Sequence, residues 1–249
     1  MLCYKVWQET RTRFLISGMA LTTFCLVAVL FEKQFRAMGG FSGERTATYT
    51  GYIYHSIYGP GKAIFVLLAL PFLGLGGLLR EKLRGTTGFT LALPLTRMRL
   101  GWTYIGLGIA ETAILSMIPL FTLTVLSPLV HESYPFTEAF HFSILWFICG
   151  GLIFSVAFLL STIVSAEYTA PVACIILLYI QALVASWRPL IPYRLNILWT
   201  INAYPNTRWN PEHTLMLSGP LPWTRLVTIL LVSFGLLGMA TLITRRQDY

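Results

Sequence analysis

Six runs of apolar residues dominate the 249-residue chain, and each is close to the length needed to cross a bilayer. A transmembrane helix requires about 20 mostly apolar residues to span about 30 Å of hydrocarbon. Only 11% of the residues are charged, whereas an ordinary soluble domain has about 25%. We therefore expect an all-α membrane protein with a single transmembrane domain, 1–249. The runs predict spans over about 14–31, 61–79, 101–125, 142–164, 169–186 and 223–244.

The basic residues near the span ends favour a cytoplasmic position for both termini. With the N-terminus inside, ten Lys and Arg residues fall on that side and eight on the other. Six of the outer eight are spread over two long segments, 32–60 and 187–222, and Lys62 and Arg225 follow just beyond them, while the inner ones crowd against helix ends. An even number of spans then returns the C-terminus to the cytoplasm. The net charge of +8 is thus explained by contacts with lipid head groups, and nucleic acid is not an expected partner.

Three shorter segments carry weaker predictions. Residues 2–13 mix apolar and charged side chains at helical spacing, which indicates an amphipathic helix in the membrane interface or a plain basic anchor. The Pro- and Trp-rich segment 187–222 predicts short helices or turns at the outer leaflet, or an irregular loop over the helix ends. Residues 165–168 are so short a link that the fourth and fifth spans must form an antiparallel hairpin.

The most informative segment lies between the second and third spans. A charged cluster, 80–84, is interrupted by Gly85, and a helix-compatible run of about nine residues follows until Pro94. Arg97 and Arg99 then precede the third span. This pattern predicts a short helix at the cytoplasmic surface, attached to a membrane helix at each end. A rigid element in that place can transmit force from a soluble partner to both spans, whereas the simpler alternative is a basic interfacial loop.

This segment resembles the coupling-helix region of ABC-2-type permeases, the membrane subunits of ABC exporters of type V. The family pattern is an acidic-basic cluster, Gly-Thr, a short apolar helix, Pro, a small polar residue and Arg. In this chain it reads Glu81-Lys82-Leu83-Arg84-Gly85-Thr86, then Leu91 to Pro94, then Thr96-Arg97. The chain departs from the family at Thr87, where Leu is usual, and at Trp102, where Lys usually follows the glycine. These departures leave the subfamily open.

The resemblance implies the permease subunit of an ATP-driven transporter that exports a lipid-like, amphiphilic or peptide cargo from the bacterial cytoplasmic membrane. It implies docking of an ABC ATPase on the helix between the second and third spans, and pairing with a second permease chain, identical or sister. The residues expected at the docking surface are Glu81, Arg84, Gly85, Thr86, Phe89 and Leu93. Glu167, in the short link, is expected to make a smaller second contact, or else belongs to a plain tight turn.

The chain carries no nucleotide-binding motif of its own. A Walker A loop requires the pattern G-x-x-x-x-G-K-[ST], but Gly61-Lys62 is followed by Ala63 and position 56 is Ser. We therefore expect no enzymatic activity and no cofactor in this chain, with ATP and Mg²⁺ bound by the partner ATPase. Besides that ATPase and the second permease chain, membrane lipids are the expected partners.

Glu111 is the one acidic residue well inside a predicted span. It lies ten positions beyond Gly101, or about 15 Å into the membrane at 1.5 Å per residue. An unpaired charge there is expensive, so the carboxyl must be protonated, paired or facing a cavity. It is predicted to line the translocation path, with a helix-packing carboxyl bonded to a neighbouring Ser, Thr or Tyr as the alternative.

Two other functions remain as alternatives, a secondary transporter and an intramembrane enzyme. The first usually has more spans and more internal charge, and the second needs paired catalytic groups inside the membrane.

His131, Glu132, Glu138 and His141 fall within eleven residues, but they lack the spacing of a metal site. Cys25, Cys149 and Cys174 lie in apolar runs and are expected to be buried hydrophobic residues.

Overall fold

The computed structural model describes residues 2–37, 48–74, 97–164, 169–193, 195–201, 207–209, 215–217 and 221–246. Most of them are helical. The α-helices are α1 (Leu2–Leu30), α2 (Glu32–Ala37), α3 (Tyr49–Ile53), α4 (Leu70–Leu73), α7 (Arg97–Leu126), α8 (Phe136–Ile163), α9 (Thr169–Ala185), α10 (Ile197–Thr200) and α11 (Trp223–Arg246). The π-helices η2 (Tyr54–Gly61) and η3 (Ile64–Ala69) lie between α3 and α4, and the 3₁₀-helices are η4 (Ser127–Val130) and η5 (Ile191–Tyr193).

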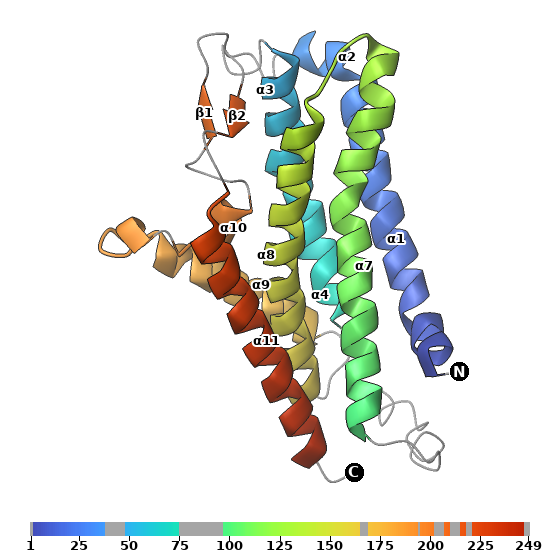
Figure 1. Cartoon of the computed structure of the whole chain (residues 1–249), viewed down its shortest axis with the longest axis vertical. Coiled ribbons are helices and arrows are strands. Elements are labelled where there is room, and N and C mark those ends of the chain that lie inside the picture. The colour runs from blue at the N-terminus through green and yellow to red at the C-terminus, as the bar shows by residue number, and fades with distance from the viewer. Residues whose placement is uncertain are drawn as a thin grey trace.

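Five helices are long and apolar enough to cross a membrane, which confirms the expectation of a helical membrane protein. They are Cys3–Leu30, Tyr49–Leu73, Arg99–Val130, Phe136–Ile163 and Trp223–Arg245. The five run along the long axis of the molecule, and both termini lie at the same end, where α7 also begins (Figure 1). We call this the terminal end. The remaining predicted span corresponds to α9, which has 17 residues and is shorter than the others.

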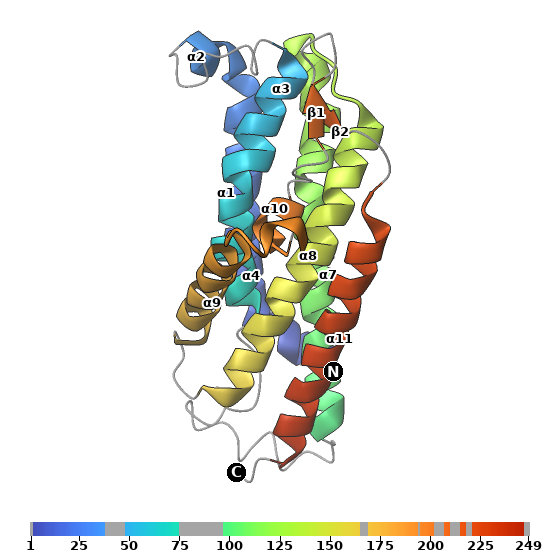
Figure 2. The ribbon, with the colours of Figure 1, turned by 90° about the vertical axis from the view of Figure 1, so that its left-hand side faces the viewer.

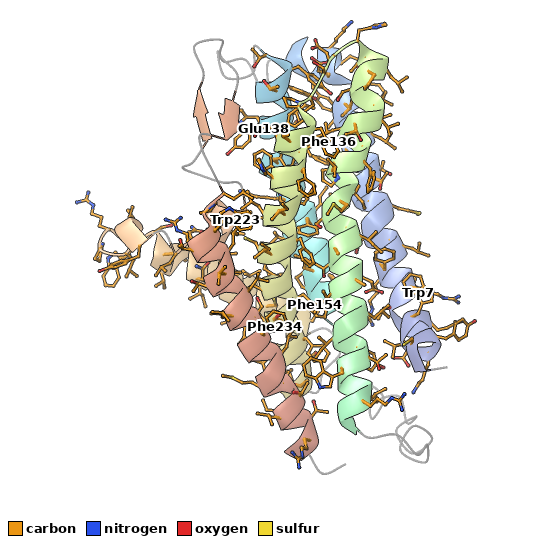
Figure 3. All side chains as sticks on the ribbon, viewed as in Figure 1. Trp7, Phe136, Glu138, Phe154, Trp223 and Phe234 are labelled. Carbon is orange, nitrogen blue, oxygen red and sulfur yellow. The ribbon has the colours of Figure 1, made fainter. Side chains whose placement is uncertain are left out.

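The bundle is built around α8, which packs against α7, α9 and α11. Figure 2 shows α9 and α11 on opposite sides of α8. Glycines permit the close approach of α7 and α8, because a Cβ at Gly108 would collide with the Phe154 ring. Figure 3 shows Phe154 in the space between these two helices. One turn along α7, Gly150 of α8 lies so close to Thr112 that a Cβ would come within 3.2 Å of its methyl group.

An aromatic column joins α8 to the helix over Tyr49–Leu73. Tyr58 stacks on Phe142 with ring centroids 4.1 Å apart, and Phe65 stacks on Trp146 at 4.8 Å. All four side chains are at most 1% exposed. Large, fully buried rings contribute much of the stability of such a core.

The second span begins earlier than the sequence predicts. The helix starts at Tyr49 rather than near Gly61, so the expected outer segment 32–60 is wrong over its last twelve residues. Thr48 caps this helix by accepting a hydrogen bond from the Gly51 amide. The Tyr52 hydroxyl donates to the Ala28 carbonyl at 2.7 Å, and the Tyr49 hydroxyl is bonded to Ser127 at 2.8 Å. Because the tyrosine hydroxyls have partners inside the bundle, residues that hydropathy treats as polar lie in its core.

The N-terminal residues do not form a separate interfacial helix. Residues 2–13 are the first three turns of α1 itself, with no break before Phe14. Val6 is fully buried and Thr10 is 6% exposed, so this part of the helix packs into the bundle. The continuous helix thus excludes a separate interfacial helix, while the alternative, a basic anchor of the first span, stays a prediction.

The remaining helices agree with the predicted boundaries to within six residues. The segments 101–125, 142–164 and 223–244 correspond to the candidate spans α7, α8 and α11, and 169–186 corresponds to the shorter helix α9. The region 187–222 contains the expected short helices, η5 and α10, together with an antiparallel pair of strands that the sequence did not indicate. These strands are β1 (Thr207–Trp209) and β2 (Leu215–Leu217), with Arg208 opposite Met216. Cys25, Cys149 and Cys174 are buried as expected, and Cys3 is exposed.

Candidate functional site

The predicted ATPase-coupling residues lie outside the described part of the chain. They are Glu81, Arg84, Gly85, Thr86, Phe89, Leu93 and Glu167. The elements that flank the first six are described. The span that begins at Tyr49 runs towards the terminal end and finishes with α4, and α7 starts at that end (Figure 1). The segment 75–96 therefore joins two helices whose connected ends both lie towards the chain termini.

Glu111 is held in the interface between α7 and α1. Its side chain is 1% exposed, and its Oε1 accepts a 2.6 Å hydrogen bond from the Thr10 hydroxyl. Its Oε2 is buried without a hydrogen-bond partner. An ionised carboxylate with one unbonded oxygen is costly at such a site, so the neutral acid is the form that fits this environment. This geometry matches the second of the two expected roles, a packing carboxyl bonded to a neighbouring helix.

A second hydrogen bond joins the same two helices closer to the terminal end. The Tyr104 hydroxyl donates to Glu9 Oε2 at 2.6 Å. Glu9 and Thr10 are consecutive on α1, while Tyr104 and Glu111 are two turns apart on one face of α7. Each pair thus sets one acid against one hydroxyl, and the two bonds run in opposite directions between the helices. One turn further along α1, an Arg13 guanidinium nitrogen lies 3.4 Å from the Phe72 carbonyl oxygen, to which it donates.

Neighbouring helices place Glu111 near the middle of the bundle. A Cβ at Gly101 would lie 3.9 Å from the Thr241 methyl group, so these residues of the antiparallel helices α7 and α11 share one depth. Ten residues along each helix, or about 15 Å, lead from this contact to Glu111 on α7 and to Leu231, the ninth of the 24 residues of α11. The contact between Thr112 and Gly150 likewise places it beside the centre of α8.

Among the grooves on the described surface of the bundle, two have well-defined walls. The first, of about 280 Å³, lies between residues 193–200 and the start of α11, and its lining includes Tyr193, Leu195 and Arg225. The second, of about 390 Å³, lies between α1 and α7 on the side of Glu111 away from the terminal end, and is almost wholly apolar. Its walls are Thr22, Ala113, Ile114, Met117, Ile118, Phe121 and Thr122. Glu111 lines neither groove, and its role in a transport path stays a prediction.

The described residues offer no site for a metal ion, since they contain no group of three or more His, Cys, Asp or Glu side chains. What they do contain is the polar contact between α1 and α7, made by Glu9, Thr10, Tyr104 and Glu111. Sequence reasoning identified Glu111 and missed the other three. The seven-residue spacing of Tyr104 and Glu111 on one helix face was the available signal.

The chain was compared with known families and characterised proteins. No family model matches it, and no curated protein matches it either.

Proposed function

We propose that this chain is the membrane subunit of an ATP-driven exporter of the ABC-2 permease type. The observation that carries the proposal is the residue pattern Glu81–Arg97, which resembles a coupling helix and lies between two membrane spans. The ends of these two spans that the segment connects lie on the side of both chain termini (Figure 1). A helix in this segment is placed to receive a push from a soluble ATPase and to pass it to both spans at once.

Six crossings are part of the proposal, with α9 as the fifth. Its 17 residues correspond to about 25 Å, a little less than the hydrocarbon thickness of about 30 Å. The chain that follows α9 lies against the start of α11, because Tyr193 and Leu195 share a groove with Thr224 and Arg225. Because α9 runs obliquely to the five long helices (Figure 1), its crossing is a proposal that rests on its apolar sequence. Six crossings put both termini on one side of the membrane, and the basic residues near the span ends favour the cytoplasmic side.

A second permease chain completes the transporter in this proposal. On α11, a Cβ at Gly235 or Gly238 would meet nothing within 4 Å, so the backbone there is open to close approach by another helix. Phe234 and Met239, next to them in sequence, are more than half exposed. The cargo class remains lipid-like, amphiphilic or peptide, and ATP is hydrolysed by the partner subunit.

Co-purification tests the proposal. The tagged chain, extracted in mild detergent from the membranes of its own host, should bring down a soluble subunit that carries a Walker A motif. Glu81→Arg should reduce the recovery of that subunit at least several-fold while the permease keeps its elution volume. The matched control is Glu132→Arg, which makes the same charge change at an exposed residue of the opposite end. Transport by the purified chain without any ATPase would refute the proposal.

A further inference from the structure

The second span is not a regular α-helix throughout. Between Tyr49 and Leu73 it contains the two π-helical stretches η2 and η3, in which hydrogen bonds join residues five apart instead of four. In η3, the Leu70 amide donates to the Phe65 carbonyl. π-Helices are rare, and they occur mostly as single turns at functional sites. A π turn contains one residue more than an α-helical turn between the same two bonded groups.

Prolines explain why the α-helical pattern is weak in this span. Pro71 has no amide, so it cannot donate the α-helical hydrogen bond to the Leu67 carbonyl. A spacing of five residues avoids the missing donor, since it matches that carbonyl with the next amide along the chain, that of Phe72. In η2, Pro60 lies between two glycines, which weaken an α-helix further. Local π turns are one way in which membrane helices satisfy the backbone groups that a proline frees.

Two close contacts with α8 lie at the two ends of η3. At its start, the Phe65 ring stacks on Trp146, and both side chains are fully buried. Beyond its end, the chain passes so close to α8 that a Cβ at Gly74 would collide with Ala157 and would lie 2.9 Å from the Phe158 amide nitrogen. Both contact atoms belong to the body of α8 rather than to the tip of a flexible side chain. The end of the second span therefore fits against α8 only when a glycine lies at this point.

Conversion of η3 to an α-helix changes which residue lies at this point. With Phe65 held on α8, its carbonyl would accept from the Ala69 amide rather than from the Leu70 amide. Each later residue then takes the position of the residue that followed it, a step of about 1.5 Å along the helix and about 100° around it. Leu73 would arrive where Gly74 now lies, and its side chain has no room there. The end of the span must then separate from α8.

We propose that η3 is a two-state switch that docks the end of the second span on α8 or releases it. In the π form, which this structure shows, Gly74 lies against α8. In the α form, the residues after Phe65 are advanced by one position and the end of the span is free. Segment 75–96 continues directly from Gly74, so a push on that segment by an ATPase selects between the two forms. This driving step rests on the proposed function, whereas the two forms are a property of the helix itself.

Deletion of a single residue tests the switch without any ATPase. When Leu67 is deleted, the Leu70 amide is four residues from the Phe65 carbonyl, which is the α-helical spacing, and Gly74 keeps its place on α8. The variant should therefore keep the elution volume and the cooperative unfolding of the wild type in detergent. Deletion of Leu107, the same residue type in the α-helix α7, puts one part of that helix out of register and should abolish both. If the two deletions disrupt folding equally, η3 contains no additional residue and the switch is refuted.

Amide hydrogen exchange in the complex with the ATPase tests the movement. In the docked form, the Gly74 amide donates to the Leu70 carbonyl at 3.1 Å. Release from α8 removes the packing around this bond, so its amide should open and exchange more often. In lipid nanodiscs, a non-hydrolysable ATP analogue should speed exchange over 70–74 several-fold. Exchange around Tyr58, which lies before the switch and stacks on Phe142, should stay slow.

The chain without Leu67 is the matched control for this measurement. It should recover the same amount of ATPase as the wild type, because segment 75–96 is intact, but the nucleotide should no longer change exchange over 70–74. Equal acceleration in this variant, or no acceleration in the wild-type complex, overturns the switch. A purified chain that brings down no ATPase at all would count against the proposed function instead, and the deletion test would still decide whether η3 has two forms.

Discussion

The Thr10 hydroxyl donates a 2.6 Å hydrogen bond to Glu111 across 101 positions of sequence, and it does so in the middle of a helical bundle. Together with the bond from Tyr104 to Glu9, it fixes the register of two parallel helices, α1 and α7. Apolar packing alone specifies such a register weakly, because one turn of sliding exchanges similar side chains. Directional bonds between buried polar groups remove that freedom.

Thr10→Val should destabilise the protein by leaving both Glu111 oxygens without a donor. Interhelical hydrogen bonds in membranes contribute about 0.6 kcal/mol on average and up to about 1.7 kcal/mol, and a buried acceptor left unbonded adds a desolvation penalty. We expect a loss of about 1–2 kcal/mol in the free energy of unfolding in detergent. Thr12→Val is the control, since Thr12 is exposed on the opposite face of the same helix.

The double mutant distinguishes this bond from simple packing. In a Glu111→Leu background no acceptor remains, so the further substitution Thr10→Val should cost much less than it does in the wild type. Glu111→Gln keeps an oxygen that can accept from Thr10 and should be tolerated best. Additive losses in the double mutant would mean that the two side chains do not interact.

Tyr104→Phe should lower stability by about 1 kcal/mol, because it removes the donor to a carboxylate oxygen while keeping the ring. The matched control is Tyr4→Phe. The Tyr4 hydroxyl is exposed and its bond is to Gln8 of the same helix, so its loss should be nearly neutral. Thermal unfolding of both variants, followed by circular dichroism, measures the difference, and equal effects would contradict an α1–α7 role for Tyr104.

The sequence predicted the class of fold and most helices, because a helix that spans a membrane must be long and apolar, and each apolar run of the sequence has that length and hydropathy. It failed where polar residues belong to the core. Tyr49 and Tyr52 are buried with bonded hydroxyls, but hydropathy assigned them to an outer loop. The polar half of α1 was assigned to the interface for the same reason. Pairings such as Glu9 with Tyr104 depend on three-dimensional register, which one sequence does not supply.

Gly108→Ala should be destabilising although alanine is the better helix former. The added Cβ would collide with the Phe154 ring, and overpacking of this kind costs about 1–3 kcal/mol. Gly106→Ala, two residues earlier, meets open space and should be neutral or stabilising, since alanine gains up to about 1 kcal/mol in a helix. Phe154→Leu should rescue Gly108→Ala in part. Unfolding midpoints that rank the two alanine variants the other way would place Gly108 outside the α7–α8 contact.

The crossing of α9 can be decided by labelling from one side of the membrane. Cys3 is exposed near the terminal end, and the other native cysteines are buried. In intact cells, an impermeant maleimide should therefore leave the wild type unlabelled, because the proposed topology puts the terminal end in the cytoplasm. Ser133→Cys, at an exposed residue between α7 and α8, should be labelled in a Cys3→Ser background. If α9 crosses the membrane, Arg188→Cys should be labelled in intact cells as Ser133→Cys is, since the two residues then lie on the same side. Labelling of Arg188→Cys only after permeabilisation would mean that α9 turns back within the membrane, and the six-span topology would fail.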